Sequence, residues 1–193
     1  MLLEFVKFLV RSFLRLCFRI KVENPELLPK EGGIIVCFNH RSNWDVPVTI
    51  TFLRRKLHFM AKKELFDIFL LGGIIAWSGA FPVNRGKGDV GAVKAAVSAL
   101  KSGKAVAMFP EGKRVKKGEV HKAKAGIALI ANLADCPILP IGISGEYKPF
   151  SKITIRIGKA FRINEERKKL EAEDLQQIST EILNKILALA EEN

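Results

Sequence analysis

The sequence of 193 residues predicts an α/β fold in which helices flank a central mixed sheet. Apolar runs that end at polar clusters are typical of buried strands, and they recur at residues 33–38, 104–108 and 137–143. Helix-like segments alternate with these strands, at residues 46–55, 90–100 and 123–134. A hydrophobic fraction of 48% with 27% charged residues excludes general disorder, so we expect one domain around a real core.

Residues 1–20 predict a helix in a membrane interface, followed by a single α/β domain over residues 21–193. Most of this helix is apolar, with a basic stripe at Lys7, Arg11, Arg15 and Arg19. A basic residue on every turn excludes a spanning helix, and the lack of a clean apolar centre and a cleavage site excludes a signal peptide. A wide apolar face with a cationic stripe is typical of interfacial helices, whose basic groups reach anionic lipid. The alternative is a helix docked on the core.

The remaining elements follow from local patterns. Further strand-like runs lie at residues 19–23, 57–60 and 153–157. Residues 68–83 are almost uncharged, but glycines and Pro82 interrupt them, so we expect buried core or the wall of an apolar ligand site instead of a membrane span. From about residue 164 onward the pattern predicts an amphipathic helix that packs on the sheet. Its apolar face carries Leu175, Ile178, Ile182, Ile186 and Leu189.

The first polar cluster, residues 39–45, lies between the strand that ends at Phe38 and the helix-like run from Val46. Sites in α/β proteins form where a strand ends and the backbone turns. In one helix His40 and Asp45 would be roughly 140° apart, so we expect His40 in the turn and Asp45 at the helix start. A carboxylate on one imidazole nitrogen leaves the other free to take a proton, as in a general base. The alternative is a helix cap beside a loop histidine.

The second cluster, residues 79–85, ends in Arg85. Residues 86–91 then match G-x-G-x-x-G, but Asn84 and Arg85 separate the preceding strand from the first glycine, which disfavours a dinucleotide site. Amide donors at the start of the following helix, next to Arg85, would still suit a phosphate.

The third cluster, residues 109–114, ends another strand and provides an acid, a glycine and two cations: Glu111, Gly112, Lys113 and Arg114. A solvated basic loop is the alternative, and it fits the lysines that follow better than it fits Glu111 and Arg114. The net charge of +12 implies an anionic partner, which is nucleic acid, acidic lipid or a phosphorylated substrate.

The three cysteines are scattered and form no C-x-x-C, which argues against a disulfide framework or a zinc site and for a reducing compartment. Cys37 lies inside an apolar strand, where a thiol is inert as a nucleophile. No metal-binding pattern and no G-x-S-x-G elbow is present.

The ordered clusters resemble the glycerolipid acyltransferase family, specifically its bacterial lysophosphatidate acyltransferases. His40 and Asp45 fit the H-x4-D motif, and residues 79–85 fit the second block. Phe109-Pro110-Glu111-Gly112 with Arg114 fits the third block, and Leu139-Pro140-Ile141 fits the fourth. The resemblance covers about residues 25–145 and implies the glycerol-3-phosphate acyltransferase-like fold. The third block usually has Thr or Ser where Lys113 stands.

The resemblance implies direct transfer of a fatty acyl group, without an acyl-enzyme or a metal, from acyl carrier protein or coenzyme A to the sn-2 hydroxyl of lysophosphatidate, giving phosphatidate. It assigns the general base to His40 and its orientation to Asp45. The implied phosphate and glycerol site consists of Arg85, Glu111, Gly112, Lys113 and Arg114. Pro140 is expected to shape the acyl-donor side.

The expected location is the cytoplasmic face of the inner or cytoplasmic membrane, with anionic lipid and not nucleic acid as the partner. One alternative is the same chemistry on glycerol 3-phosphate, another lysophospholipid or a lyso-aminolipid. A more remote one is a non-enzymatic basic membrane-surface protein, which would have no use for the pair His40 and Asp45.

Overall fold

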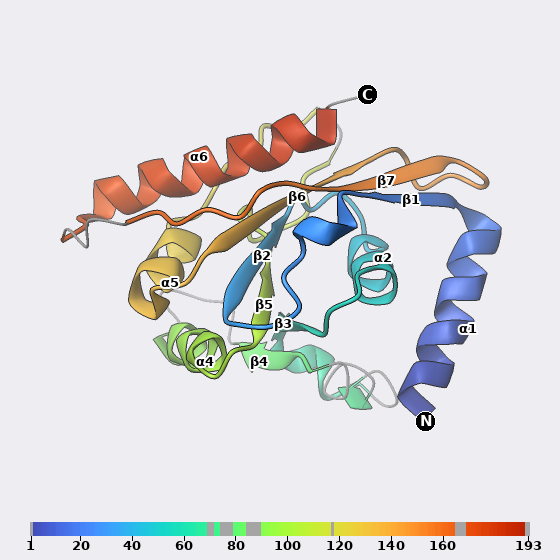
Figure 1. Cartoon of the computed structure of the whole chain (residues 1–193), viewed down its shortest axis with the longest axis horizontal. Coiled ribbons are helices and arrows are strands. Elements are labelled where there is room, and N and C mark those ends of the chain that lie inside the picture. Colours follow the sequence, from blue (N-terminus) through green and yellow to red (C-terminus); the bar gives the residue numbers. More distant parts are fainter. Residues whose placement is uncertain are drawn as a thin grey trace.

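The computed structural model describes residues 2–68, 72–73, 79–83, 90–116, 118–164 and 169–191. Within these residues, seven strands form one sheet between two layers of helices (Figure 1). The strands are β1 (Arg19–Glu23), β2 (Ile34–Phe38), β3 (Leu57–Lys62), β4 (Phe81–Val83), β5 (Ala105–Met108), β6 (Ile138–Ser144) and β7 (Lys152–Ile157). The helices are α1 (Leu2–Cys17), α2 (Asp45–Phe52), α4 (Val90–Lys101), α5 (Gly126–Ala134) and α6 (Ala172–Glu191).

The sheet is mixed, as the sequence predicts, with the strand order β1-β7-β6-β2-β5-β3-β4. Neighbouring strands run parallel except for the antiparallel pair β6 and β7. All residues of the central strand β2 are buried, which explains its unbroken apolar sequence. Because β2, β5 and β6 run in the same direction, their carboxyl ends meet at one edge of the sheet.

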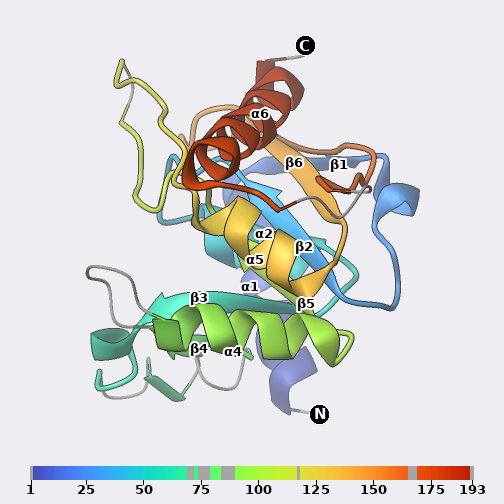
Figure 2. The same ribbon diagram turned by 90° about the vertical axis from the view of Figure 1, so that its left-hand side faces the viewer.

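Helices cover both faces of the sheet. Ile34, Val36 and Phe38 of β2 pack into the core beneath α1 and α2. The alternate residues Ile35 and Cys37 pack into a second core beneath α4, α5 and α6. Figure 2 shows these last three helices side by side in front of the sheet.

One side of helix α1 packs on the rest of the domain, and another side, which is apolar, is exposed. Leu14 is fully buried, and Phe18, just after the helix, is 6% exposed. The Nε of Arg11 donates to the carbonyl of Thr51 at 2.8 Å, and its guanidinium lies over the Phe52 ring. Arg11 is therefore directed toward α2 and not outward toward lipid, which corrects that part of the expectation. The exposed side carries Phe5, Phe8, Leu9, Phe13 and Leu16.

In the described part of the chain, none of the helices combines the length and apolarity that crossing a membrane requires.

The C-terminal helix α6 begins at Ala172, later than predicted. The carboxylate of Asp174 accepts a hydrogen bond from the Glu171 amide at 2.8 Å, and acidic groups favour a helix N-terminus. Its apolar face packs on β6, β7 and α5, as expected. The packing is close at Gly142, where a Cβ would lie 2.4 Å from the Ala190 nitrogen, so β6 needs glycine at this position.

Candidate active site

The candidate site lies at the edge where β2, β5 and β6 end. His40 follows β2, Glu111 follows β5, and Tyr147 lies in the loop between β6 and β7. Two backbone hydrogen bonds fasten the segment after β5 to its surroundings: the Val115 amide donates to the His40 carbonyl at 2.8 Å, and the Lys124 amide donates to the Pro110 carbonyl at 2.9 Å. Segments far apart in the sequence are thus held around His40.

His40 and Asp45 form a hydrogen-bonded pair. The Nδ1 of His40 lies 3.0 Å from Asp45 Oδ2, and Asp45 has no exposed surface. The same oxygen accepts the backbone N–H groups of Arg41 at 2.8 Å and Ser42 at 2.7 Å. His40 is in the turn and Asp45 starts α2, as predicted. These amides precede α2, so Asp45 fixes the turn that carries His40 and does not act only as a helix cap.

Tyr147 is a partner of Asp45 that the sequence did not indicate. Its hydroxyl donates to Asp45 Oδ1 at 2.8 Å. Burial, with the negative charge of Asp45, raises the pKa of Tyr147, so the phenol keeps its proton and acts as a donor. It is the only tyrosine of the chain, which was the one available signal.

Phe109, the first residue of the third cluster, stacks on the imidazole of His40. The ring centroids are 4.0 Å apart and the planes differ by 20°. Together with the Asp45 hydrogen bond, this contact fixes the position and tilt of the imidazole. Since Nδ1 faces Asp45, Nε2 is the ring nitrogen left to exchange a proton with a substrate.

Glu111 is buried beside His40, with 3% of its surface exposed. Its Oε1 accepts the His40 backbone N–H at 3.2 Å and lies 3.1 Å from Nδ1 of His121. Its Oε2 is buried without a hydrogen-bond partner among the described residues. His121, which the sequence did not single out, is thus a second histidine paired with a carboxylate at this edge.

The remaining predicted site residues of the described chain, Gly112, Lys113, Arg114 and Pro140, lie in different surroundings. Gly112 has a φ of 65°, in the left-handed region that favours glycine. Lys113 and Arg114 are exposed in the same loop. Pro140 is buried inside β6, where its carbonyl accepts the Gly158 amide at 2.9 Å. Pro140 pairs with Cys37, three residues before His40, and its role on the acyl-donor side stays a prediction.

Some predicted features lie outside the described residues. They are Arg85, the first four positions of the G-x-G-x-x-G match, and much of the apolar run 68–83. Their predicted roles, in binding phosphate and in lining an apolar site, therefore stay predictions.

Cys37 is fully buried in β2, and burial raises the pKa of its thiol well above the ordinary value. Burial likewise raises the pKa of Cys136 to about 11. Both thiols are therefore protonated at neutral pH and unsuited to nucleophilic attack.

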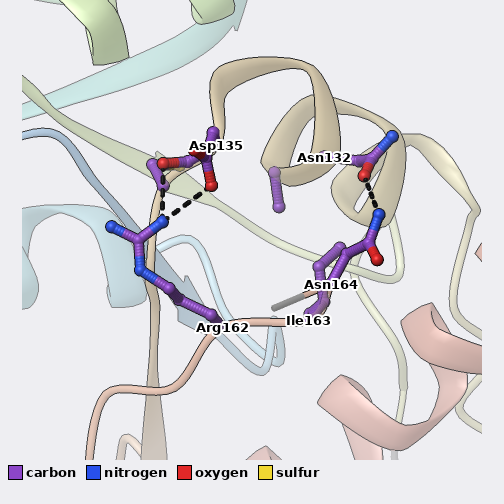
Figure 3. A pocket seen from close by; sticks show the side chains of 7 residues that line it. Asn132, Asp135, Arg162, Ile163 and Asn164 are labelled. Atoms are coloured by element: carbon purple, nitrogen blue, oxygen red, sulfur yellow. Dashed lines mark hydrogen bonds and ion pairs between the residues drawn. The ribbon is translucent and has the colours of Figure 1, made fainter. Parts of the chain in front are cut away.

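A pocket of about 330 Å³ lies elsewhere, between the end of α5 and residues 162–164 (Figure 3). Its polar side chains bind one another: Arg162 pairs with Asp135 at 2.8 Å, and Asn164 donates to Asn132 at 2.8 Å. It opens near the start of β6, whereas His40 lies at the edge where β6 ends, so the pocket is separate from the candidate site.

The fold and the pair of His40 and Asp45 at the end of β2 together define a class of protein. Comparison with known families shows which class this is. A model of the family described as Acyltransferase matches residues 19–144, and the chain belongs to that family. The resemblance inferred from the four motifs is therefore confirmed.

Two bacterial relatives are each named 1-acyl-sn-glycerol-3-phosphate acyltransferase. The one from Bacillus subtilis is 34% identical over 128 residues, which are 65% of this chain and 63% of the relative. The one from Streptococcus pneumoniae is 30% identical over 178 residues, which are 88% of this chain and 65% of the relative. The chain thus spans slightly less than two thirds of the length of these relatives.

The fold is also similar to a solved structure. The crystal structure of the 1-acyl-sn-glycerophosphate acyltransferase from Thermotoga maritima superposes with a TM-score of 0.77 at 25% identity, covering 99% of this chain and 80% of that one. The α/β architecture and the N-terminal helix are therefore those of a known acyltransferase.

Proposed function

We propose that this chain transfers a fatty acyl group from a thioester to the sn-2 hydroxyl of lysophosphatidate, giving phosphatidate. The observation that carries the proposal is the hydrogen bond of the fully buried Asp45 to Nδ1 of His40, at the end of β2. Membership of the Acyltransferase family and the names of the bacterial relatives support the same reaction class and acceptor.

His40 acts as the general base. Its Nε2 takes the proton of the acceptor hydroxyl while that oxygen attacks the thioester carbonyl. The carbon–sulfur bond then breaks, and the departing thiolate receives the proton from the imidazolium. Asp45 stabilises the imidazolium, and a positioned base of this kind accelerates a reaction about 10²–10⁴-fold. Because Cys37 is buried and protonated, direct transfer is favoured over an acyl-enzyme.

Glu111 and the cations that follow it bind the acceptor. The buried Oε2 of Glu111 is an acceptor without a partner among the described residues, which suits a glycerol hydroxyl that donates to it. Arg114, together with Arg85, holds the phosphate, because guanidinium groups bind phosphate in a bidentate fashion. Lys113 and the backbone at Gly112 complete this anion site.

Acyl carrier protein or coenzyme A supplies the thioester, and the reaction needs no metal. The enzyme works on the cytoplasmic face of the inner or cytoplasmic membrane. The large apolar side chains exposed on α1, with Phe8 63% exposed, support an interfacial position, and the net charge of +12 favours anionic lipid.

The proposal is tested with purified protein in detergent, a long-chain acyl thioester and three acceptors: lysophosphatidate, glycerol 3-phosphate and monoacylglycerol. We expect phosphatidate from lysophosphatidate and little product from monoacylglycerol, which lacks the phosphate. Arg114→Ala should raise the KM for lysophosphatidate. Equal use of monoacylglycerol would contradict the phosphate site, and a preference for glycerol 3-phosphate would transfer the assignment to that acceptor.

A further inference from the structure

The loop between β6 and β7 brings Tyr147 to the side of Asp45 that faces away from His40. Asp45 Oδ2 receives three hydrogen bonds, from His40 and from the amides of Arg41 and Ser42. The Tyr147 hydroxyl at 2.8 Å is the partner of the other oxygen, Oδ1. A buried carboxylate oxygen without a donor is costly, so this hydroxyl completes the solvation of a fully buried charge.

The loop is built to hold Tyr147 in this position. Gly145 has a φ of 94°, and a Cβ there would lie 2.1 Å from the Lys152 carbonyl oxygen, so the loop turns back only with glycine. The Phe150 amide donates to the Cys17 carbonyl at the end of α1, at 2.6 Å. The ring of Tyr147 packs edge-on against Phe18, with centroids 5.4 Å apart. Contacts at the end of α1 and at Phe18 therefore orient the phenol.

We infer that Tyr147 is a positioning residue: its hydroxyl fixes the orientation of the Asp45 carboxylate and shares its negative charge, and so tunes the basicity of His40. The inference rests on the proposed function, because it takes His40 to be the base. It adds a third member, 102 positions after Asp45 in the sequence, to the pair.

Loss of the Tyr147 hydroxyl should change the basicity of His40 in one definite direction. The hydrogen bond from Tyr147 withdraws part of the negative charge of Asp45. When this hydrogen bond is removed, the carboxylate stabilises the imidazolium of His40 more strongly than before. His40 would then hold its proton to higher pH and would act as a base over a narrower range of pH. Among the described residues, other charged or titratable groups beside the pair include Arg41, near Tyr147, and Glu111 with its partner His121. None of them is changed by Tyr147→Phe.

The test uses the whole protein with Tyr147→Phe, which removes only the hydroxyl. We expect kcat to fall about tenfold or more with KM within about twofold of the wild type. The acid limb of the pH profile of kcat/KM should move upward by roughly half a unit or more. The control is Thr51→Val, which removes a buried hydroxyl of α2 that bonds to the Pro47 carbonyl and does not contact Asp45.

A second measurement is independent of activity. The chain has three histidines, so the imidazole signals are few, and His40→Ala assigns the one of interest. The NMR titration midpoint of His40 should rise in Tyr147→Phe and stay unchanged in Thr51→Val. An unmoved midpoint, or an equal shift in both variants, would overturn the inference. If the wild type is inactive on lysophosphatidate but the His40 midpoint still rises in Tyr147→Phe, only the proposed function is contradicted.

Discussion

At the scale of single residues, Asp45 shows how local and distant sequence contribute to one site. Its contacts with His40, Arg41 and Ser42 lie within five positions, and the predicted turn and helix start bring them together. The sequence could therefore predict the pair. Its contact with Tyr147 depends on β6 lying parallel to β2 and on the shape of the following loop. No short-range pattern carries that information.

Asp45→Asn should abolish most activity while the fold persists. The amide oxygen can take the place of Oδ2 and accept the Arg41 and Ser42 amides, while the NH2 group can donate to the Tyr147 oxygen. The charge that stabilises the imidazolium is lost, so kcat should fall by roughly 10²–10⁴-fold. Steady-state kinetics, with a thermal melt as the control for folding, check this. A kcat within threefold of the wild type would contradict the role of Asp45.

At the scale of elements, the strand and helix segments were predictable because each has its own apolar period. The order of the strands was not, since it depends on which apolar faces pack together. The sequence could not show that β7 inserts between β1 and β6, antiparallel to β6. The orientation of α1 was likewise hidden, because its basic stripe fits both lipid and a docked surface. In the structure Arg11 binds the Thr51 carbonyl.

The two sides of α1 should respond differently to substitution. Phe5→Ser with Phe8→Ser changes exposed residues, so membrane binding should weaken while the melting temperature is unchanged. Leu14→Ala changes a fully buried residue and should lower stability by about 2–5 kcal/mol. Flotation with anionic vesicles and thermal melts measure the two effects. Undiminished vesicle binding by the double variant would rule out this face as the membrane contact.

The edge strand β1 should contribute stability that depends on pH. Hydrogen bonds from Lys21 and Arg156 hold the pKa of Glu23 below its ordinary value of 4.5. A lowered carboxyl pKa stabilises the fold above the ordinary value, and the contribution is lost as pH falls through the folded-state pKa. Glu23→Gln should therefore cost less than about 1 kcal/mol at pH 7, because the pair is partly exposed.

Urea unfolding of the wild type and Glu23→Gln at neutral and acidic pH measures this difference. The difference in unfolding free energy should shrink as the solution becomes acidic. A difference that is equal at both pH values would show that the ion pair is not its source.

At the scale of the whole molecule, the first and third clusters meet because the parallel strands β2 and β5 end at one edge of the sheet. The structure brings His40, Asp45 and Glu111 together there, with Phe109 stacked on the imidazole. It leaves Pro140 buried in β6. Motif order therefore predicted the family, and the turn before α2 predicted the contact of His40 with Asp45, whereas the positions of Tyr147 and His121 required the assembled fold.

Acyl transfer by purified protein in detergent, measured for the wild type beside His40→Ala, tests both the proposed reaction and its general base. The substrates are a long-chain acyl thioester and lysophosphatidate. We expect phosphatidate from the wild type and a rate lower by roughly 10²–10⁴-fold from a variant with the same melting behaviour. Equal rates would show that the pair of His40 and Asp45 is structural, and absence of product from both proteins would contradict the proposed reaction.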